Sequence, residues 1–488
     1  MPLTELGAIL SYGAHVPRLR LSRSVIQTAM AWTHPPARNA ARGARAICNW
    51  DEDALTMAVE ASRTCLAELD SEAVQSTGVP QSICLCSTTA PFADRDNAVI
   101  VAAALDLPES TQTMNLGASL RAGVSGLIGA LRRSDGANTL LVASDARLAR
   151  AGSPQELTYG DAAVAILIGV PNPAAIATVL GTRTLSDDFV DHYRMHGAAF
   201  DYVLEERWVR DESLLQRVPQ VIAELLSAAG EAADSIKHLV LPVSAATAKR
   251  IAEACAMPTA RRDDRVLAEC GDAGVALPLL QLAATLEAAI PGDLIVLVGL
   301  GQGVDAALLR AEAGVSRADK ALTHALNAKR EEPSYVRYLA HRGLVEVDFG
   351  MRAERDQRTA HTVAYRKRGA ITGFKGGRCT QCGTVQFPQS RVCVNPTCRM
   401  TDTQVPHRLA ESTGRVKSFT EDWQAYSVRP PYVYGNVEFV EGGNLLMEFT
   451  DVESGELKVN DDVRFVFRIK DDDRARGFRR YFWKATRT

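Results

Sequence analysis

Short apolar runs alternate with longer amphipathic stretches over the first ~312 residues of the chain. The runs are partly β-branched and are typical of buried strands; they cover residues 82–86, 138–144, 163–170, 238–243 and 293–300. Between them, apolar residues recur at helical spacing, which predicts helices over 53–69, 120–133, 214–230 and 277–290. Strands and helices that alternate in this way predict a layered α/β architecture.

Two similar segments close the two halves of this region. GDAAVAILIG spans residues 160–169, and GDLIVLVGLG spans residues 292–301. Each places a strand after a turn of small residues, so the pattern suggests an internal duplication.

The pattern changes after residue 312. Residues 313–370 are charged and helical, with a strongly basic stretch at 351–369, and we interpret them as a solvated helical linker. From Gly414 onward, five short strand-like runs are separated by turn signals, which favours a small barrel of OB type. We therefore predict four parts, at residues 1–312, 313–370, 371–410 and 411–488.

Composition limits the function classes. The 488 residues are 46% hydrophobic and 23% charged, with a formal net charge of -3, which is typical of a globular protein without electrostatic attraction to nucleic acid or anionic membrane. The start of the chain lacks a signal-peptide pattern, and no apolar stretch approaches ~20 residues. We expect a cytoplasmic protein with no membrane partner, whose ten cysteines are reduced.

Four of the cysteines fall within one short stretch: Cys379, Cys382, Cys393 and Cys398. Four thiolates satisfy a tetrahedral zinc ion, and Gly383 supplies the tight turn that the first pair needs. Because no histidine or open ligand position is evident, we expect structural zinc rather than catalytic zinc. Metal would then contribute folding energy to a segment too small for its own core.

The ribbon, the GRVKSFT run and Pro430–Tyr432 together resemble the rubredoxin-like zinc-ribbon/OB-fold proteins that accompany thiolases. The likeness covers residues ~332 to 488. It implies pairing with an enzyme that condenses or cleaves acyl-CoA, and a share in holding the coenzyme A.

The first ~312 residues resemble the thiolase superfamily, most closely the archaeal-type hydroxymethylglutaryl-CoA synthases, with β-ketoacyl synthase III more distant. The likeness rests on the order and spacing of segments at residues 11–21, 49–66, 144–149, 159–169, 191–201 and 291–309. It implies a layered thiolase-like α-β-α-β-α domain that acts on coenzyme A thioesters and forms homo- or hetero-oligomers.

Family members use a cysteine, a glutamate, a histidine and an asparagine. Here the cysteine position falls on Leu120 or Ser119, and the glutamate position falls within residues 87–89, which read Ser-Thr-Thr. The histidine position falls on Pro242, and the asparagine position on Asp272. Ser119 as a nucleophile and Asp272 as a base stay open as candidates, beside the alternatives of a helix-start serine and a loop aspartate.

Three other residues could substitute for the missing groups. Cys86 and Cys270 lie beside predicted strand ends, where cysteines usually pack as small hydrophobic residues. His238 begins a predicted strand, and we expect it on the surface. Arg121, Arg194 and Lys249 are ordinary candidates for coenzyme A contacts, because no motif marks them.

Three hypotheses of function follow. The first is an acyltransferase-type subunit that binds acyl-CoA and works with a separate thiolase, its own catalytic residues having been replaced. The second is a self-sufficient synthase-like condensing enzyme that uses unusual residues. The third is a zinc-ribbon/OB nucleic-acid binder, supported by the aromatic residues Trp423, Tyr426, Tyr432 and Tyr434 but opposed by the acidic net charge.

Overall fold

The computed structural model describes residues 6–33, 42–67, 78–133, 136–316, 318–348, 360–473 and 476–488. The chain divides into two compact units. The first unit comprises Met1–Cys48, Asp53–Ala102 and Leu107–Tyr338, and the second comprises Asn49–Glu52, Ala103–Asp106 and Leu339–Thr488. Residues 351–359 of the basic stretch lie outside the described residues.

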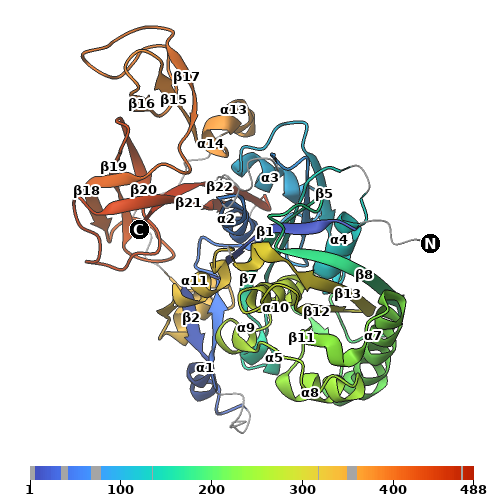
Figure 1. The fold of residues 1–488 in the computed structure, drawn as a ribbon. Coiled ribbons are helices and arrows are strands. Elements are labelled where there is room, and N and C mark those ends of the chain that lie inside the picture. Colours follow the sequence, from blue (N-terminus) through green and yellow to red (C-terminus); the bar gives the residue numbers. More distant parts are fainter. Residues whose placement is uncertain are drawn as a thin grey trace. The chain divides into compact units, whose positions relative to one another are not determined.

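A nine-stranded sheet runs through the described part of the first unit in the order β11-β12-β13-β8-β1-β7-β6-β4-β5 (Figure 1). Its strands are β1 (Ala8–His15), β4 (Ser82–Cys86), β5 (Gln112–Leu116), β6 (Thr139–Ala146), β7 (Asp161–Gly169), β8 (Ala177–Ser186), β11 (Ile236–Val240), β12 (Leu294–Leu300) and β13 (Gly303–Ala311). The predicted strands are confirmed within a few residues, because their apolar side chains are buried on both faces.

The sheet repeats one pairing pattern in its two halves. In the first half, β4 runs parallel to β6, and β6, β7 and β1 are antiparallel in turn. In the second half, β11 runs parallel to β12, and β12, β13 and β8 are antiparallel in turn. The halves join where β1 pairs with β8 at two positions. This repeat supports the duplication suggested by the two similar segments.

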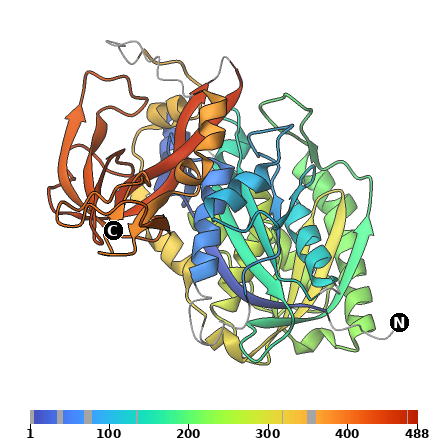
Figure 2. The same cartoon turned by 90° about the horizontal axis from the view of Figure 1, so that it is seen from above.

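Helices separate and cover these half-sheets. Helices α4 (Ala122–Leu131) and α10 (Leu277–Leu286) pack in a core with apolar residues of both half-sheets. Helix α2 (Ala54–Ala67) packs on β1, β6 and β7 (Figure 2). Helices α7 (Leu215–Ala229) and α8 (Ala245–Ala254) cover the other face of β11–β13. The result is the layered α/β arrangement that the sequence predicted.

The interpretation of 313–370 as a solvated linker is wrong for its first part. Helix α11 (Ala321–Asn327) buries Leu322 and Leu326, and Tyr338 is 1% exposed. Strand β14 (Arg330–Glu331) pairs with β2 (Leu19–Ser22). Apolar side chains at helical spacing, among many charges, carry this segment into the core of the first unit.

The second unit contains a five-stranded sheet in the order β20-β19-β18-β21-β22. Its strands are β18 (Gly414–Asp422), β19 (Tyr432–Phe439), β20 (Asn444–Glu448), β21 (Asp462–Asp473) and β22 (Phe478–Arg487). Phe449 bridges Ala485, which brings the two edge strands together and closes a small barrel. Phe374, Phe465 and Trp483 are fully buried in its core.

A smaller three-stranded sheet precedes the barrel, in the order β16-β15-β17. It consists of β15 (Lys375–Cys379), β16 (Val385–Gln386) and β17 (Gln404–Arg408). This short sheet holds the four clustered cysteines. No helix among the residues that the structure describes is long and apolar enough to cross a membrane.

Candidate functional site

A buried carboxylate organises the polar centre of the first unit. Asp145, near the end of β6, is 0% exposed and accepts hydrogen bonds from the backbone N–H groups of Thr88, Thr89 and Val275 at 2.8, 3.1 and 3.1 Å. The hydroxyls of Ser87, Thr88 and Thr89 donate to it as well. Burial raises the pKa of Asp145, and the N–H donors oppose that rise. The resemblance places the family's glutamate within residues 87–89. The hydroxyl groups of these residues are therefore engaged in hydrogen bonds to Asp145.

Ser119 lies just before α4, where the resemblance places the nucleophile. Its hydroxyl donates to the carbonyl oxygen of Gly301 at 3.0 Å and accepts a weaker bond from the N–H of Arg121 at 3.4 Å. A Cβ on Gly301 would come within 2.7 Å of the Ser119 oxygen, so only glycine permits this approach. A serine whose proton goes to a carbonyl has no base to activate it.

Asp272 belongs to an ion-pair network. One of its carboxylate oxygens lies 2.7 Å from Arg147, and the other accepts the N–H of Gly274 at 2.9 Å. The Arg147 guanidinium also pairs with Asp201 at 3.0 Å and lies 3.5 Å above the ring of Tyr159. Burial lowers the pKa of Arg147, but the carboxylates around it raise the pKa above its ordinary value. Both carboxylate oxygens of Asp272 are therefore engaged, one by a guanidinium and the other by a backbone N–H.

The structure keeps the two predicted catalytic residues apart. Among the described residues, no hydrogen bond or ion pair joins Ser119 to Asp272, and no histidine takes part in either network. The roles predicted for Ser119 and Asp272 stay predictions.

The alternative residues are no better placed as nucleophiles or bases. Burial raises the pKa of Cys270 to about 12, and a hydrogen bond with Cys84 together with burial raises the pKa of Cys86. Neither is a thiolate near neutral pH. The expectation of a surface position for His238 is wrong: it is 3% exposed and lies 3.0 Å from Asp293. Its strand β11 is at the edge of the sheet, but the backbone at Arg261 covers the open side of that strand at this position.

A cavity of about 680 Å³ opens beside these networks. Three loops of the first unit line it, after β4, around the end of β5, and between β9 (His192–Tyr193) and β10 (Tyr202–Val203). The lining residues are Leu85, Ser87, Thr88, Ala90–Asn97, Asn115–Gly117 and Arg194–Ala198. This volume is within the range of small-molecule sites.

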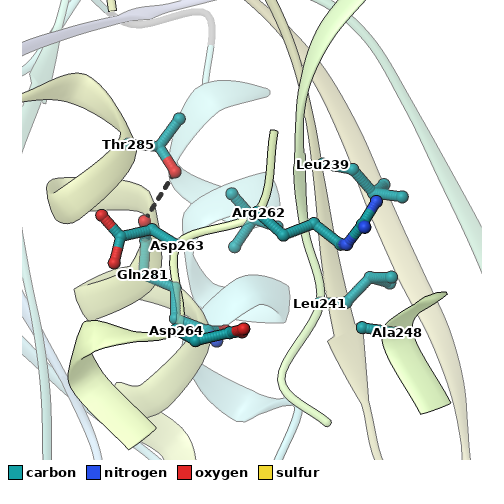
Figure 3. A pocket seen from close by; sticks show the side chains of 9 residues that line it. Leu239, Leu241, Ala248, Arg262, Asp263, Asp264, Gln281 and Thr285 are labelled. Atoms are coloured by element: carbon teal, nitrogen blue, oxygen red, sulfur yellow. Dashed lines mark hydrogen bonds between the residues drawn. The ribbon is translucent and has the colours of Figure 1, made fainter. Parts of the chain in front are cut away.

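A second pocket is far smaller, about 10 Å³, and lies between β11 and α10 (Figure 3). Leu239, Leu241 and Ala248 form its apolar side. The Gln281 side-chain oxygen is buried without a hydrogen-bond partner among the described residues. The space suits one water molecule, which would satisfy that oxygen, and is too small for a substrate.

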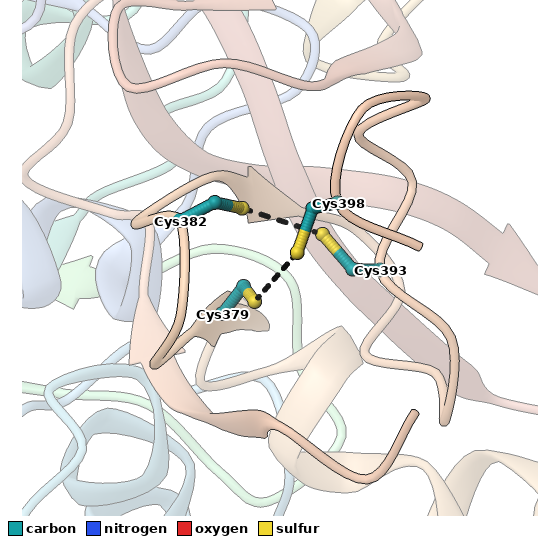
Figure 4. A group of neighbouring side chains, drawn as sticks. All are labelled: Cys379, Cys382, Cys393 and Cys398. Atoms are coloured by element: carbon teal, nitrogen blue, oxygen red, sulfur yellow. Dashed lines mark hydrogen bonds between the residues drawn. The ribbon is translucent and has the colours of Figure 1, made fainter. Parts of the chain in front are cut away.

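The four clustered cysteines of the second unit meet at one point (Figure 4). All four sulfurs lie within 4.8 Å of one another, with Cys379 3.9 Å from Cys398 and Cys382 3.6 Å from Cys393. Both separations exceed a disulfide bond. A tetrahedral zinc ion with Zn–S distances of about 2.3 Å sets its sulfurs about 3.8 Å apart, so the thiols fit zinc.

Hydrogen bonds lower the pKa values of Cys379 and Cys382, whereas burial raises the pKa of Cys393 and the pKa of Cys398 is also raised. A hydrogen bond with the hydroxyl of Thr403, followed by one with the backbone N–H of Cys382, lowers the pKa of Cys379 to about 6. Gly383 turns the chain after the first pair with φ +75°. This is the left-handed turn that the sequence predicted at that glycine.

Sequence reasoning singled out neither Asp145 nor His196, although Arg194 of the cavity loop was among the candidates for coenzyme A contacts. Asp145 carries a signal that could have found it, since a charged residue directly after an apolar strand of a layered α/β domain lies at the edge where sites form. The place of the loop at 194–198 beside Thr88 was not predictable, because it depends on contacts between residues over 100 positions apart.

Comparison with curated proteins relates the chain to hydroxymethylglutaryl-CoA synthases of archaea. It is 22% identical to the enzyme of Pyrococcus horikoshii over 62% of this chain and 85% of that protein. It is 26% identical to the enzyme of Caldivirga maquilingensis over 60% of this chain and 84% of that protein. The match to the Methanosphaera stadtmanae enzyme, at 28% identity, covers 39% of this chain and only 55% of that protein.

Solved structures share the fold. MvaS in complex with 3-hydroxy-3-methylglutaryl coenzyme A matches with a TM-score of 0.59 and 18% identity, over 70% of this chain and 92% of that chain. An HMG-CoA synthase complexed with CoA matches with a TM-score of 0.57 and 14% identity, over 83% of this chain and 100% of that chain. The 3-oxoacyl-(acyl carrier protein) synthase III of Pseudomonas aeruginosa matches with a TM-score of 0.53 and 19% identity. That match covers 63% of this chain and 98% of that chain.

The family described as "ChsH2, C-terminal OB-fold domain" matches residues 407–468. The chain thus combines a thiolase-like domain, similar to the archaeal hydroxymethylglutaryl-CoA synthases, with a C-terminal OB-fold domain. Both expectations of fold from the sequence are confirmed.

Proposed function

We propose that this chain binds an acyl-CoA in the 680 Å³ cavity and acts as one subunit of a thiolase-type complex that makes or breaks a carbon–carbon bond. In this proposal the chain's own synthase residues have been replaced, and a separate thiolase subunit supplies the missing chemistry. The comparisons support the substrate class, because two of the structural neighbours are described as complexes with coenzyme A or its thioester.

One observation carries the proposal: the groups at the family's catalytic positions are engaged elsewhere, while the cavity beside them remains. The Ser87, Thr88 and Thr89 hydroxyls donate to Asp145, and that of Ser119 donates to the Gly301 carbonyl. Serine and threonine hydroxyls held in this way neither carry an acyl group nor move a proton. A ligand site without these functions fits a subunit that presents a substrate.

Purified chain without any partner is therefore expected to bind acetyl-CoA but not to convert it. Binding would be measured by isothermal titration calorimetry, and conversion by mass spectrometry of acetyl-CoA, acetoacetyl-CoA and free CoA over hours. Addition of the thiolase that co-purifies from the native cell is expected to start turnover.

Turnover by the chain alone would contradict the subunit proposal and favour the second hypothesis, a self-sufficient condensing enzyme. The variants Ser119→Ala and Asp272→Asn would then show which of the two candidates carries the reaction. Absence of acetyl-CoA binding would contradict both hypotheses.

We place the partner contact of the first unit on β5. This strand ends the order of the sheet and pairs with β4. Met114 and Leu116 are 36% and 39% exposed, and Val99 on the neighbouring α3 (Asn97–Ala104) is 48% exposed. An exposed apolar edge strand pairs readily with another chain. The occupant we propose is a second thiolase-fold chain, either a copy of this protein or the thiolase subunit.

The variant Met114→Glu is expected to reduce the molar mass measured by light scattering after gel filtration to that of a single chain. A charge at the centre of the edge strand repels a partner strand while the monomer stays folded. Ile290→Glu, at a residue that is 65% exposed in a loop, is the matched control and should leave the mass unchanged. A wild-type protein that is monomeric both alone and with the thiolase would contradict this contact.

We further propose that Cys379, Cys382, Cys393 and Cys398 hold one structural zinc ion. The support is the spacing of their four sulfurs and the short chain segment that carries them. With all four positions filled by sulfur, zinc would have no open site for substrate, so its contribution would be to folding.

A further inference from the structure

A tight turn lines the cavity between β9 and β10. The N–H of Ala198 donates to the carbonyl oxygen of Met195 at 3.0 Å and closes the turn. Gly197 has φ +80°, which suits the third position of a type II turn. His196 occupies the second position, is exposed, and belongs to the lining of the cavity.

Buried groups hold this turn in place. Arg194 donates to the carbonyl oxygen of Thr88 and lies 3.8 Å from Asp201. Asp201 is held in turn by Arg147 and by the hydroxyl of Tyr159, each at 3.0 Å. Because Arg147 is only 4% exposed, the loop that carries His196 is tied to the interior at both ends.

Most polar side chains of the cavity already have partners. Hydroxyl and amide groups bond to carboxylates or carbonyls, and charged groups pair with neighbours. These engagements are Ser87 and Thr88 with Asp145, Asn97 with the Phe92 carbonyl, Asn115 with Asp96, Arg95 with the Phe92 ring and Arg194 with Asp201.

His196 and Asp94 differ from these groups. Neither has a hydrogen bond or ion pair with any residue that the structure describes. The carbonyl oxygen of a thioester only accepts hydrogen bonds, so it requires a donor. An ionised Asp94 cannot donate, whereas imidazole donates in both its neutral and its protonated form.

We infer that His196 donates a hydrogen bond to the thioester carbonyl oxygen of the acyl-CoA bound in this cavity. The inference rests on the proposed function, because it takes acyl-CoA as the ligand. It assigns specificity for thioester over free coenzyme A to a residue outside the four positions of the family motif.

The test compares acetyl-CoA with free CoA, which lacks the carbonyl. The full chain is titrated calorimetrically with each ligand as wild type, His196→Ala and His196→Gln. Loss of one hydrogen bond is expected to weaken acetyl-CoA binding about tenfold in His196→Ala and to leave CoA binding unchanged. His196→Gln keeps an N–H donor and should retain most of the affinity. His324→Ala, an exposed histidine on α11, is the control.

A spectroscopic readout separates this contact from a packing effect. The carbonyl stretch of acetyl-CoA labelled with ¹³C at the carbonyl should shift to lower frequency when bound to wild type, and the shift should disappear in His196→Ala. Equal weakening of both ligands, or an unchanged carbonyl stretch, would overturn the inference while acyl-CoA binding itself stands. Failure of the wild type to bind either ligand would overturn the inference together with the proposed function.

Discussion

Replacement of Cys393 by alanine is expected to abolish zinc binding and to unfold the ribbon around it. Cys393 is 2% exposed, and its sulfur lies 3.6 Å from that of Cys382. The short strands β15, β16 and β17 enclose little apolar surface. Metal binding contributes on the order of 10 kcal/mol to folding in small zinc domains, so loss of one ligand should cost several kcal/mol. Zinc per chain would be measured by inductively coupled plasma mass spectrometry, and stability by thermal unfolding.

The matched control is Cys255→Ala, at a partly buried cysteine that ends α8 in the first unit. The Cys255→Ala variant should bind one zinc ion per chain, and the thermal unfolding transition of its second unit should be unchanged. Chelation of the wild-type protein provides a test without any packing change: a strong chelator should lower the same transition, and zinc should restore it. If the purified wild-type chain contained no zinc, this result would contradict the proposed zinc site.

The variant Asp145→Ala is expected to destabilise the first unit by about 4 kcal/mol or more. It would leave the N–H groups of Thr88, Thr89 and Val275 without their acceptor, and each unsatisfied buried group costs about 1–3 kcal/mol. Asp145→Asn keeps one acceptor oxygen and avoids burying a charge, so its effect should be smaller. Urea unfolding, followed by fluorescence and circular dichroism, would give both values.

Asp94→Asn is the control for this comparison. Asp94 is exposed, lies on the same loop region, and has no partner among the described residues, so its change should stay within about 0.5 kcal/mol of zero. If Asp145→Ala unfolded at the same urea concentration as the wild type, the hydrogen-bond network would not hold the Ser87–Thr89 segment.

The cysteine cluster and the secondary structure of the first unit could both be predicted from the sequence. Four cysteines at short spacing, with Gly383 after the first pair, predict a metal site, and the structure brings their sulfurs together because the turn and all four cysteines lie within 20 consecutive residues. The strands and helices of the first unit were equally predictable, since burial of a whole face or layer requires apolar residues at a regular period.

Groups that depend on distant contacts were not predictable. His238 looked like a surface residue because it begins a short apolar run, yet strand β12 and the segment at Arg261 flank it and it is buried beside Asp293. Tyr338 lay in a segment dominated by charge, which concealed its place in the core. In both cases the local pattern reports only on neighbours in the chain.

The sequence by itself determined the α/β layering, the small C-terminal barrel and the clustering of four cysteines, and it predicted that the family's four catalytic residue types are absent from their expected positions. Only the tertiary structure decided which contacts the residues at those positions make. Asp145 accepts the hydroxyl hydrogen bonds of residues 87–89, Arg147 pairs with Asp272, and Arg194 ties the His196 turn to Thr88. These contacts join residues 57, 125 and 106 positions apart. The first contact forms where β4 and β6 pair within one half-sheet. The other two join residues of different halves, so they exist only after the two half-sheets have packed and brought the loops at their strand ends together.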